Sequence, residues 1–292
     1  MALLGWGLMT LGAFVRVSES GLGCPDWPSC HGQLVVGGNH ALIEEVHRWV
    51  AAVLTVGVMA LALAVFRNYH TQRRLTWPMA LVLALLVLQV ALGGVTVLLG
   101  NVAWTVVLHY GAAALLVASL VFVAVRLAFP TTQPANHDAF SRLVVWFVVL
   151  SFGLLLAGST VANTDSHTAC GTGFPLCNGT LVPSLDHHVL INLLHRAWAV
   201  LMLSFSVWVL TRSRRDSVNR AIRRAATTVT VLFVVQAAMG IAVIDLGENS
   251  VIEVLHSSLA SLTWTALAVL LSLARTLSHD AAPTRGISVG SE

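Results

Sequence analysis

The sequence has no lysine and few charged side chains of any kind. Of its 292 residues, 10% are charged and 57% are hydrophobic, and the mean hydropathy is +0.81. A soluble domain usually carries about 25% charged residues, so this composition excludes an ordinary soluble protein. The chain is predicted to lie mostly in lipid.

Hydrophobic runs long enough to cross a bilayer recur along the whole chain. A helix needs about 20 residues to span the hydrocarbon layer, and lipid requires that backbone groups pair inside helices. We therefore expect an all-α integral membrane protein with eight transmembrane helices. The first run is short and lacks the basic leader of a cleavable signal, so we expect a retained helix. The expected spans are 2–17, 42–66, 77–99, 103–125, 143–162, 190–211, 225–244 and 251–274.

All sixteen cationic side chains are arginine, and their distribution predicts the orientation. Thirteen follow the second, fourth, sixth and eighth spans, whereas Arg16, Arg48 and Arg196 lie at the opposite ends. By the positive-inside rule, the side of the membrane that carries thirteen arginines is cytoplasmic. We expect a cell (plasma) membrane protein with both termini cytoplasmic. The arginine run at 212–224 is typical of a cytoplasmic loop, so no nucleic-acid partner is predicted.

The chain contains an internal repeat. The offsets between matching segments are 146 to 148 residues, which indicates one four-helix unit duplicated in parallel. The matching segments are "CPDWPSCHG" at 24 with "CGTGFPLCNG" at 170, "HRW" at 47 with "HRAW" at 195, "QVALGG" at 89 with "QAAMGI" at 236, and "LHYGAA" at 108 with "LHSSLA" at 255. We expect two tandem four-helix bundles. Their boundaries are 1–128 and 142–275, with a cytoplasmic linker at 129–141 and a cytoplasmic tail at 276–292.

Each unit places two histidines inside its expected spans. Each histidine lies five or six residues from the outer end of its span, about 8–9 Å deep. Two imidazoles at one depth on facing helices suit the axial ligands of one haem iron. The pairs are His47 with His109 and His195 with His256. Alanine follows each histidine by four residues and leaves room for a flat macrocycle; these are Ala51, Ala113, Ala199 and Ala260.

Other metals fit the histidine pairs less well. Zinc takes three or four protein ligands, and a non-haem iron triad needs a carboxylate. Glu44 offers one in the first unit, but Asn192 stands at the matching position of the second. Two haems, one in each unit, are the simpler prediction. Arg48 and Arg196 directly follow histidines and are candidate partners of the haem propionates, or they extend to the membrane interface.

The acidic residues near the histidines are expected to have different roles. Glu44 lies one turn before the first histidine of its unit, on the same face, and is a candidate catalytic proton acceptor or donor. Glu45 is expected to face solvent at the rim. The presence of Asn192 in the second unit predicts that one haem reacts and the other passes electrons. Glu253 is either an equivalent acid of the second unit or a rim residue.

The four cysteines lie in two outer loops. In an oxidising compartment, a disulfide within each loop is the expected arrangement. The repeat favours Cys24–Cys30 and Cys170–Cys177 over the other pairings. Closing such a short loop stabilises the fold by about 2–2.5 kcal/mol. Both a structural role and a redox role near the reacting haem remain open.

These motifs resemble those of the haem A synthase family. The resemblance rests on "VRVSESGLGCPDWPSCHG", on "EEVHRW" and on the repetition of the same plan from about Val15 to Arg275. It implies an eight-helix membrane oxidoreductase that converts the C8 methyl of haem O to a formyl group by two successive oxidations. The product would be haem A for cytochrome oxidase. A haem O synthase and an electron donor are implied as partners, and a homo-oligomer remains open.

The resemblance also assigns roles to individual residues. It implies that His47 and His109 hold the substrate haem O, whereas His195 and His256 hold a cofactor haem b. Glu44 matches the functional acid of the family, whereas Glu253 has no counterpart in the family pattern.

Two other functions fit the same residues. One is a bis-histidine di-haem b cytochrome that only transfers electrons. The other is a haem transporter or chaperone, for which histidines in the outer loops would be pick-up ligands. Those outer histidines are His31, His40, His167, His187 and His188.

Overall fold

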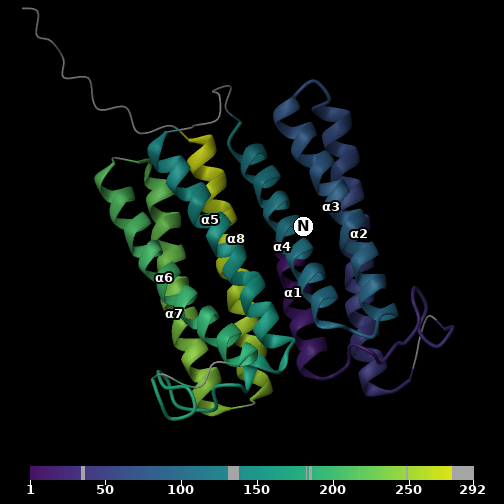
Figure 1. Ribbon diagram of the computed structural model, residues 1–292. Helices are drawn as coiled ribbons and strands as arrows, with labels where there is room; N and C mark the ends of the chain where they lie inside the picture. Colours follow the sequence, from purple (N-terminus) through teal and green to yellow (C-terminus); the bar gives the residue numbers. More distant parts are fainter. Residues whose placement is uncertain are drawn as a thin grey trace, which may run out of the picture.

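The computed structural model describes residues 1–33, 37–130, 138–181, 183, 186–216, 218–247 and 249–277. Within these ranges the chain is helical apart from two isolated β-bridges, and it forms one short 3-10 turn and eight α-helices (Figure 1). The helices are α1 (Ala2–Val17), α2 (Asn39–Asn68), α3 (Arg73–Leu98), α4 (Ala103–Ala128), α5 (Ala139–Ala162), α6 (His187–Arg215), α7 (Arg220–Leu246) and α8 (Ser250–Thr276). Seven of them are long and apolar enough to cross a membrane, whereas α1 has 16 residues. The prediction of an all-α integral membrane protein is confirmed.

Polar N-cap side chains mark the starts of α5, α6, α7 and α8, each of which accepts a hydrogen bond from a backbone N–H of the first turn. For α6, Asp186 accepts a hydrogen bond from the backbone N–H of Val189 at 2.9 Å. This bond lowers the pKa of Asp186. Consequently α6 starts three residues before the expected span at 190. The helix α2 also starts three residues before its expected span at 42, although its N-cap Gly38 has no side chain to cap it.

The predicted linker and tail lie partly outside the described residues. Of the linker at 129–141, residues 131–137 are not described, and α5 already begins at Ala139. Of the tail at 276–292, the described part ends at residue 277.

The helices form two groups that stand side by side (Figure 1). Among α1 to α4, α1 contacts α2 and α4, and α3 contacts the same two helices. Among α5 to α8, α5 contacts α6 and α8, and α7 contacts those two. The groups meet through α1, α4, α5 and α8. The contact pattern inside one group therefore repeats inside the other.

Each group has an apolar core, and both cores lie toward the ends that carry the arginine-rich loops; the core around α5 to α8 also includes Val121 and Val125 of α4. In α5 to α8, Phe147 is fully buried and packs against Phe205 and Phe233, with ring centroids 5.1 and 5.5 Å apart. In α1 to α4, Val58 and Met79 belong to the corresponding cluster. The opposite ends, nearer the cysteine loops, carry the four histidines.

Tryptophans join the two groups at mid-height. The indole Nε1 of Trp264 on α8 donates to the carbonyl of Ala114 on α4 at 2.7 Å. The indole Nε1 of Trp6 on α1 donates to the carbonyl of Ser258 on α8 at 3.1 Å. Because buried indole N–H groups need acceptors, these bonds fix the register between the groups.

Candidate functional site

Each of the four histidines faces a glycine on the preceding helix. A Cβ placed on that glycine would lie only 3.0–3.3 Å from the imidazole Cε1, so each imidazole edge rests against a helix backbone. The four pairs are Gly12 with His47, Gly93 with His109, Gly158 with His195, and Gly240 with His256. The repeated close approach indicates that both groups build the same kind of imidazole site.

The buried imidazoles keep ring nitrogens unused. Within the described part of the chain, the buried Nδ1 atoms of His47, His109 and His195 have no hydrogen-bond partner. A neutral imidazole can use one nitrogen for a metal and the other for a hydrogen bond. An unpartnered buried ring nitrogen therefore fits a residue that ligates a metal.

Two glutamines support the second histidine of each group. The amide Nε2 of Gln89 lies 3.2 Å from Nε2 of His109, and that of Gln236 lies 3.3 Å from both ring nitrogens of His256. Partners of this kind orient imidazole ligands. Sequence reasoning missed these glutamines and the glycines. The signal was present, because "QVALGG" and "QAAMGI" each place a glutamine four residues before a glycine.

The two helices that carry each expected histidine pair, α2 with α4 and α6 with α8, lie diagonally across their group of helices. The imidazoles of His47 and His109, and those of His195 and His256, are near enough for their charges to interact. The four alanines one turn beyond the histidines are partly buried. Paired imidazoles, unused nitrogens and small neighbouring residues fit a haem held between two helices.

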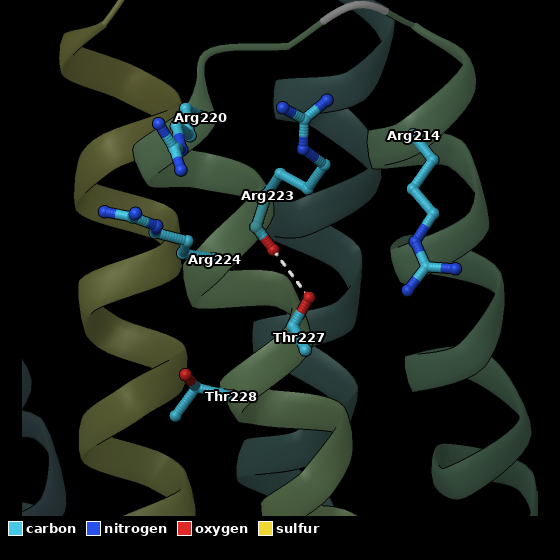
Figure 2. Close-up of a pocket in the computed structure, with 6 residues that line it drawn as sticks. All are labelled: Arg214, Arg220, Arg223, Arg224, Thr227 and Thr228. Atoms are coloured by element: carbon cyan, nitrogen blue, oxygen red, sulfur yellow. Dashed lines mark hydrogen bonds between the residues drawn. The ribbon is translucent and has the colours of Figure 1, made fainter.

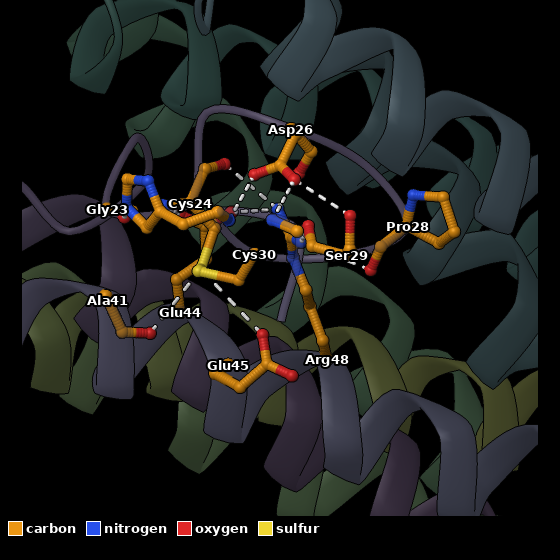
Figure 3. Close-up of a disulfide and its surroundings, with 12 residues drawn as sticks. Gly23, Cys24, Asp26, Pro28, Ser29, Cys30, Ala41, Glu44, Glu45 and Arg48 are labelled. Atoms are coloured by element: carbon orange, nitrogen blue, oxygen red, sulfur yellow. Dashed lines mark hydrogen bonds and ion pairs between the residues drawn. A yellow bond between two sulfur atoms is a disulfide. The ribbon is translucent and has the colours of Figure 1, made fainter. Parts of the chain in front are cut away.

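Glu44 and Arg48 form the centre of a hydrogen-bond network beneath the first cysteine loop (Figure 3). The carboxylate of Glu44 is buried and accepts from the backbone N–H of Cys24 at 2.9 Å and from Arg48 Nη2 at 2.7 Å. Arg48 also donates to the backbone carbonyls of Cys24, Asp26 and Ser29 at 3.1, 3.0 and 2.7 Å. The guanidinium group therefore ties α2 to the loop.

Asp26 organises the loop itself. Its carboxylate accepts from the backbone N–H groups of Gly32 and His31 at 2.9 and 2.6 Å, and from the hydroxyl of Ser29 at 2.8 Å. The N–H of Gly32, followed by the Ser29 hydroxyl, holds the pKa of Asp26 well below its usual range. The loop is thus held by an ionised carboxylate at neutral pH.

The second group has a sparser network at the matching positions. Asn192 is buried and donates to the carbonyl of Ser166 at 2.7 Å. Arg196 donates to the carbonyl of Leu176 at 3.2 Å, its one hydrogen bond within the described residues. Arg48 and Arg196 were expected to be equivalent, but Arg48 is occupied by the loop and Arg196 keeps most of its donors for another partner.

The expectation that Glu45 faces solvent is wrong. Its relative exposure is 5%, and its Oε2 lies 3.8 Å from the sulfur of Cys24. The reason is that α2 begins earlier than expected and the cysteine loop covers its second turn. Leu193 lies at the matching position beside the second disulfide, so the second disulfide has an apolar side chain where the first has Glu45.

Both predicted disulfides are present. Cys24 bonds to Cys30, and Cys170 bonds to Cys177. All four cysteines are at most 1% exposed. Because a thiol must reach a sulfur atom to exchange with it, this burial favours a structural role.

The outer histidines hold their own loops. His40 lies 3.0 Å from the hydroxyl of Ser20, and His188 lies 3.1 Å from that of Ser166, at the matching position of the repeat. His167 contacts the carbonyl of Thr164 at 2.7 Å. These hydrogen bonds show that the three histidines support the structure of their loops.

Glu253 has a partner in the other group of helices. Its carboxylate lies 3.4 Å from Arg16 Nη2, and Arg16 Nη1 donates to the carbonyl of Ala162 at 3.0 Å. Arg16 at the end of α1 thereby contacts both α5 and α8. Glu253 belongs to an ion pair between the two groups.

The chain also matches known proteins along most of its length. The cytochrome oxidase assembly protein family COX15-CtaA matches residues 1–268. The chain belongs to this family. The matched region includes all four histidines and both disulfide loops.

Curated relatives cover the chain almost completely. It is 30% identical over 277 residues to the "Heme A synthase" of Shouchella clausii, with 90% of each chain covered. It is 32% identical over 273 residues to the "Heme A synthase" of Symbiobacterium thermophilum, covering 89% of this chain and 88% of the relative. The "Heme A synthase" of Halalkalibacterium halodurans is 29% identical over 267 residues, with 88% of each chain covered.

Proposed function

We propose that this protein is a haem A synthase, an oxidoreductase that converts the C8 methyl group of haem O to a formyl group. The family membership and the names of the relatives support a role in haem A biosynthesis. The product would serve cytochrome oxidase. The paired imidazoles support binding of two haems, one in each group of helices.

The residues present fit these two haems. His47 and His109 would hold haem O as the substrate, and His195 and His256 would hold haem b as the resident cofactor. Three of these imidazoles have an unpartnered buried nitrogen, and all four lie against a glycine that keeps the neighbouring backbone close. The guanidinium of Arg196 makes one hydrogen bond among the described residues and is a candidate partner of a haem propionate. Arg48 would have to break its hydrogen bonds to the loop carbonyls to take that role.

The observation that carries the assignment of roles is the difference between Glu44 and Asn192. Both side chains are buried one turn before a histidine. A carboxylate can accept and release a proton, whereas an amide cannot at neutral pH. An acid in only the first group supports chemistry there and electron transfer in the second.

The reaction is two successive oxidations of one carbon. The methyl group becomes an alcohol and then a geminal diol, which loses water to leave the aldehyde. Each hydroxylation balances either with dioxygen, two electrons and two protons, which also gives water, or with water and the release of two electrons and two protons to the redox partner. When bound, haem b supplies a one-electron transfer centre. The histidines orient the substrate, and the carboxylate of Glu44 moves a proton during the oxidation.

The first cysteine loop would exclude water from the substrate. Trp27 in this loop packs on α3, because a Cβ on Gly94 would lie 3.1 Å from its ring. Gly94 is next to Gly93, which faces His109. The loop therefore covers the outer end of the substrate site, and a dry site favours controlled oxidation of a methyl group.

The environment and partners follow from the same proposal. The protein would lie in the plasma membrane with the cysteine loops outside and both termini in the cytoplasm. A haem O synthase would supply the substrate, and an electron donor or acceptor would exchange electrons with haem b. The arginine distribution supports this orientation.

The haems extracted from the purified protein test the proposal. The protein is isolated from a membrane that also makes haem O, and its haems are identified by mass. Haem A or a hydroxylated haem O beside haem B is the expected result. Haem B alone would indicate an electron-transfer cytochrome, and absence of any haem would contradict the histidine assignments.

A further inference from the structure

An open cleft of about 610 Å³ lies at the end of the molecule opposite the cysteine loops. Its lining residues are Arg214 of α6 and Arg220, Arg223, Arg224, Thr227 and Thr228 of α7. Figure 2 shows the three α7 arginines in the first turns of the helix, with the threonines one turn further along and Arg214 beside them on α6. Four cations thus surround one cleft at the edge of the membrane-spanning region.

The four guanidinium groups have no acidic partner among the described residues. The nearest acid in the sequence, Asp216, is already paired with Arg212 at 2.9 Å. Clustered like charges raise the free energy of the protein unless an anion binds between them. The cleft is therefore suited to an anionic ligand.

Along one face of α7, the side chains change from charged to polar to apolar with distance from the start of the helix. Positions 220, 223, 224, 227, 228, 231, 234 and 235 follow helical spacing and share one face. The arginines come first, then two exposed threonines, and then Val231, Val234 and Val235, which are 44–55% exposed. This order matches the phosphate, ester and acyl regions of a phospholipid.

The spacing along the helix supports the same ligand. One helical turn, about 5–6 Å, separates Arg224 from Thr228, and ester groups lie at about this distance below a lipid phosphate. The hydroxyl of Thr228 has no hydrogen-bond partner within the described residues, so it can donate to an ester carbonyl. The valines would then lie along the acyl chain.

The other half of the repeat has only part of this arrangement. At an offset of 147 residues, Arg67 and Arg73 match Arg214 and Arg220, but Thr76 and Trp77 stand where α7 has Arg223 and Arg224. The orientation of a membrane protein depends on the number of basic residues near the spans and does not require them to share a cleft. The clustering in one half needs a separate cause.

We propose that this cleft binds the headgroup of an anionic phospholipid, with the phosphate between the arginines and the acyl chains along the exposed face of α7. Basic pockets between transmembrane helices are suited to such headgroups. Arg214 lies 19 residues after His195 on the same helix α6, about 28 Å along its axis, so the cleft is at the opposite end from the histidines and the proposal does not depend on the haem chemistry.

Native mass spectrometry of the haem-loaded protein in neutral detergent tests the proposal, with dioleoyl phosphatidylglycerol as the probe. The variant Arg223→Gln/Arg224→Gln is expected to bind it at least about tenfold more weakly than the wild type. The matched control, Arg67→Gln/Arg73→Gln, removes two exposed arginines from the same end of the molecule but outside the cleft and should bind as the wild type does. Arg214→Gln on the neighbouring helix repeats the test if the double variant does not fold.

Two further binding measurements identify the class of ligand. Phosphatidylcholine with the same acyl chains should bind more weakly than phosphatidylglycerol, and free glycerol phosphate should not displace the lipid. Equal binding to the cleft variant and the control would overturn the proposal, because it would show a diffuse basic surface. Displacement by free glycerol phosphate at equal concentration would overturn the lipid assignment in favour of a soluble anion.

Discussion

Arg48 and Glu44 lie one turn apart on α2, with 2.7 Å between the guanidinium Nη2 and the carboxylate Oε1. Their side chains are only 15% and 6% exposed. The same guanidinium binds the carbonyls of the first cysteine loop, and the same carboxylate binds the N–H of Cys24. The candidate catalytic acid therefore also anchors the loop that covers the proposed substrate site, and its two roles need separate tests.

Replacement of Glu44 by glutamine separates these roles. The amide keeps the size of the side chain and can still accept from the Cys24 N–H, but it cannot carry the proton. We expect Glu44→Gln to retain both haems and to form haem A on the order of 10²-fold more slowly. Glu45→Gln, which changes the neighbouring buried acid, is the control and should stay near the wild type. A normal rate for Glu44→Gln, measured by the mass of extracted haems, would remove Glu44 from the mechanism.

The glycines that face the histidines are expected to control haem binding in one group at a time. Gly93→Ala would place a Cβ 3.1 Å from His109 and Gly240→Ala would place one 3.2 Å from His256. Because each imidazole must shift to avoid this contact, affinity for the haem of that group should fall about tenfold to a hundredfold. The measurement is the haem-to-protein ratio together with the identity of the haem lost.

The control for this experiment is Gly7→Ala on α1, where a Cβ would meet no atom within 4 Å. It should leave both haems in place. If Gly93→Ala and Gly240→Ala also bind both haems with normal affinity, the glycines serve helix packing alone.

The ion pair between Arg16 and Glu253 is expected to stabilise the contact between the two groups of helices. The side chains are 26% and 23% exposed, so the pair should contribute at most about 1 kcal/mol, and less at high salt. Arg16→Ala also removes the bond to Ala162, so a double-mutant cycle with Glu253→Ala is needed. Thermal unfolding of the four proteins gives the coupling free energy, and a value of zero would show that the pair contributes nothing.

Loss of the first disulfide distinguishes its structural role from a redox role. Cys24→Ser/Cys30→Ser should lower stability by about 2–2.5 kcal/mol and should slow haem A formation only as far as the loop loosens. Cys170→Ser/Cys177→Ser, in the other half, is the matched control and should cost a similar free energy. Complete loss of haem A formation with unchanged stability and haem content in the first variant would instead establish a redox role.

Much of the fold could be predicted from the sequence, because lipid allows few alternatives. The hydrophobic runs located all eight helices, and the repeat suggested a parallel duplication. Helix ends were less predictable. Both α2 and α6 begin three residues early, and for α6 the reason is that the capping side chain of Asp186, not hydrophobicity, sets the start of the helix. The contacts of Trp264 and Trp6 between the groups depend on tertiary packing and leave no periodic signal.

The candidate site was predicted in part. The histidine pairs and the disulfides follow from residue type and spacing, and the disulfides are confirmed. The burial of Glu45 was not foreseen, because a polar residue in the first turns of a helix usually faces solvent unless a loop folds over it. The hydrogen bonds from Arg48 to backbone carbonyls were also not predicted, because a sequence pattern shows side chains and does not show where backbone acceptors lie.

The most direct test of the account is the identity of the haem that each histidine pair holds. The haems of His47→Ala/His109→Ala and of His195→Ala/His256→Ala, each purified from a membrane that makes haem O, are extracted and identified by mass. The account predicts that the first variant loses haem O and haem A but keeps haem B, and that the second loses haem B. Loss of the same haem from both variants, or retention of both haems by either one, would contradict the division into a substrate half and a cofactor half.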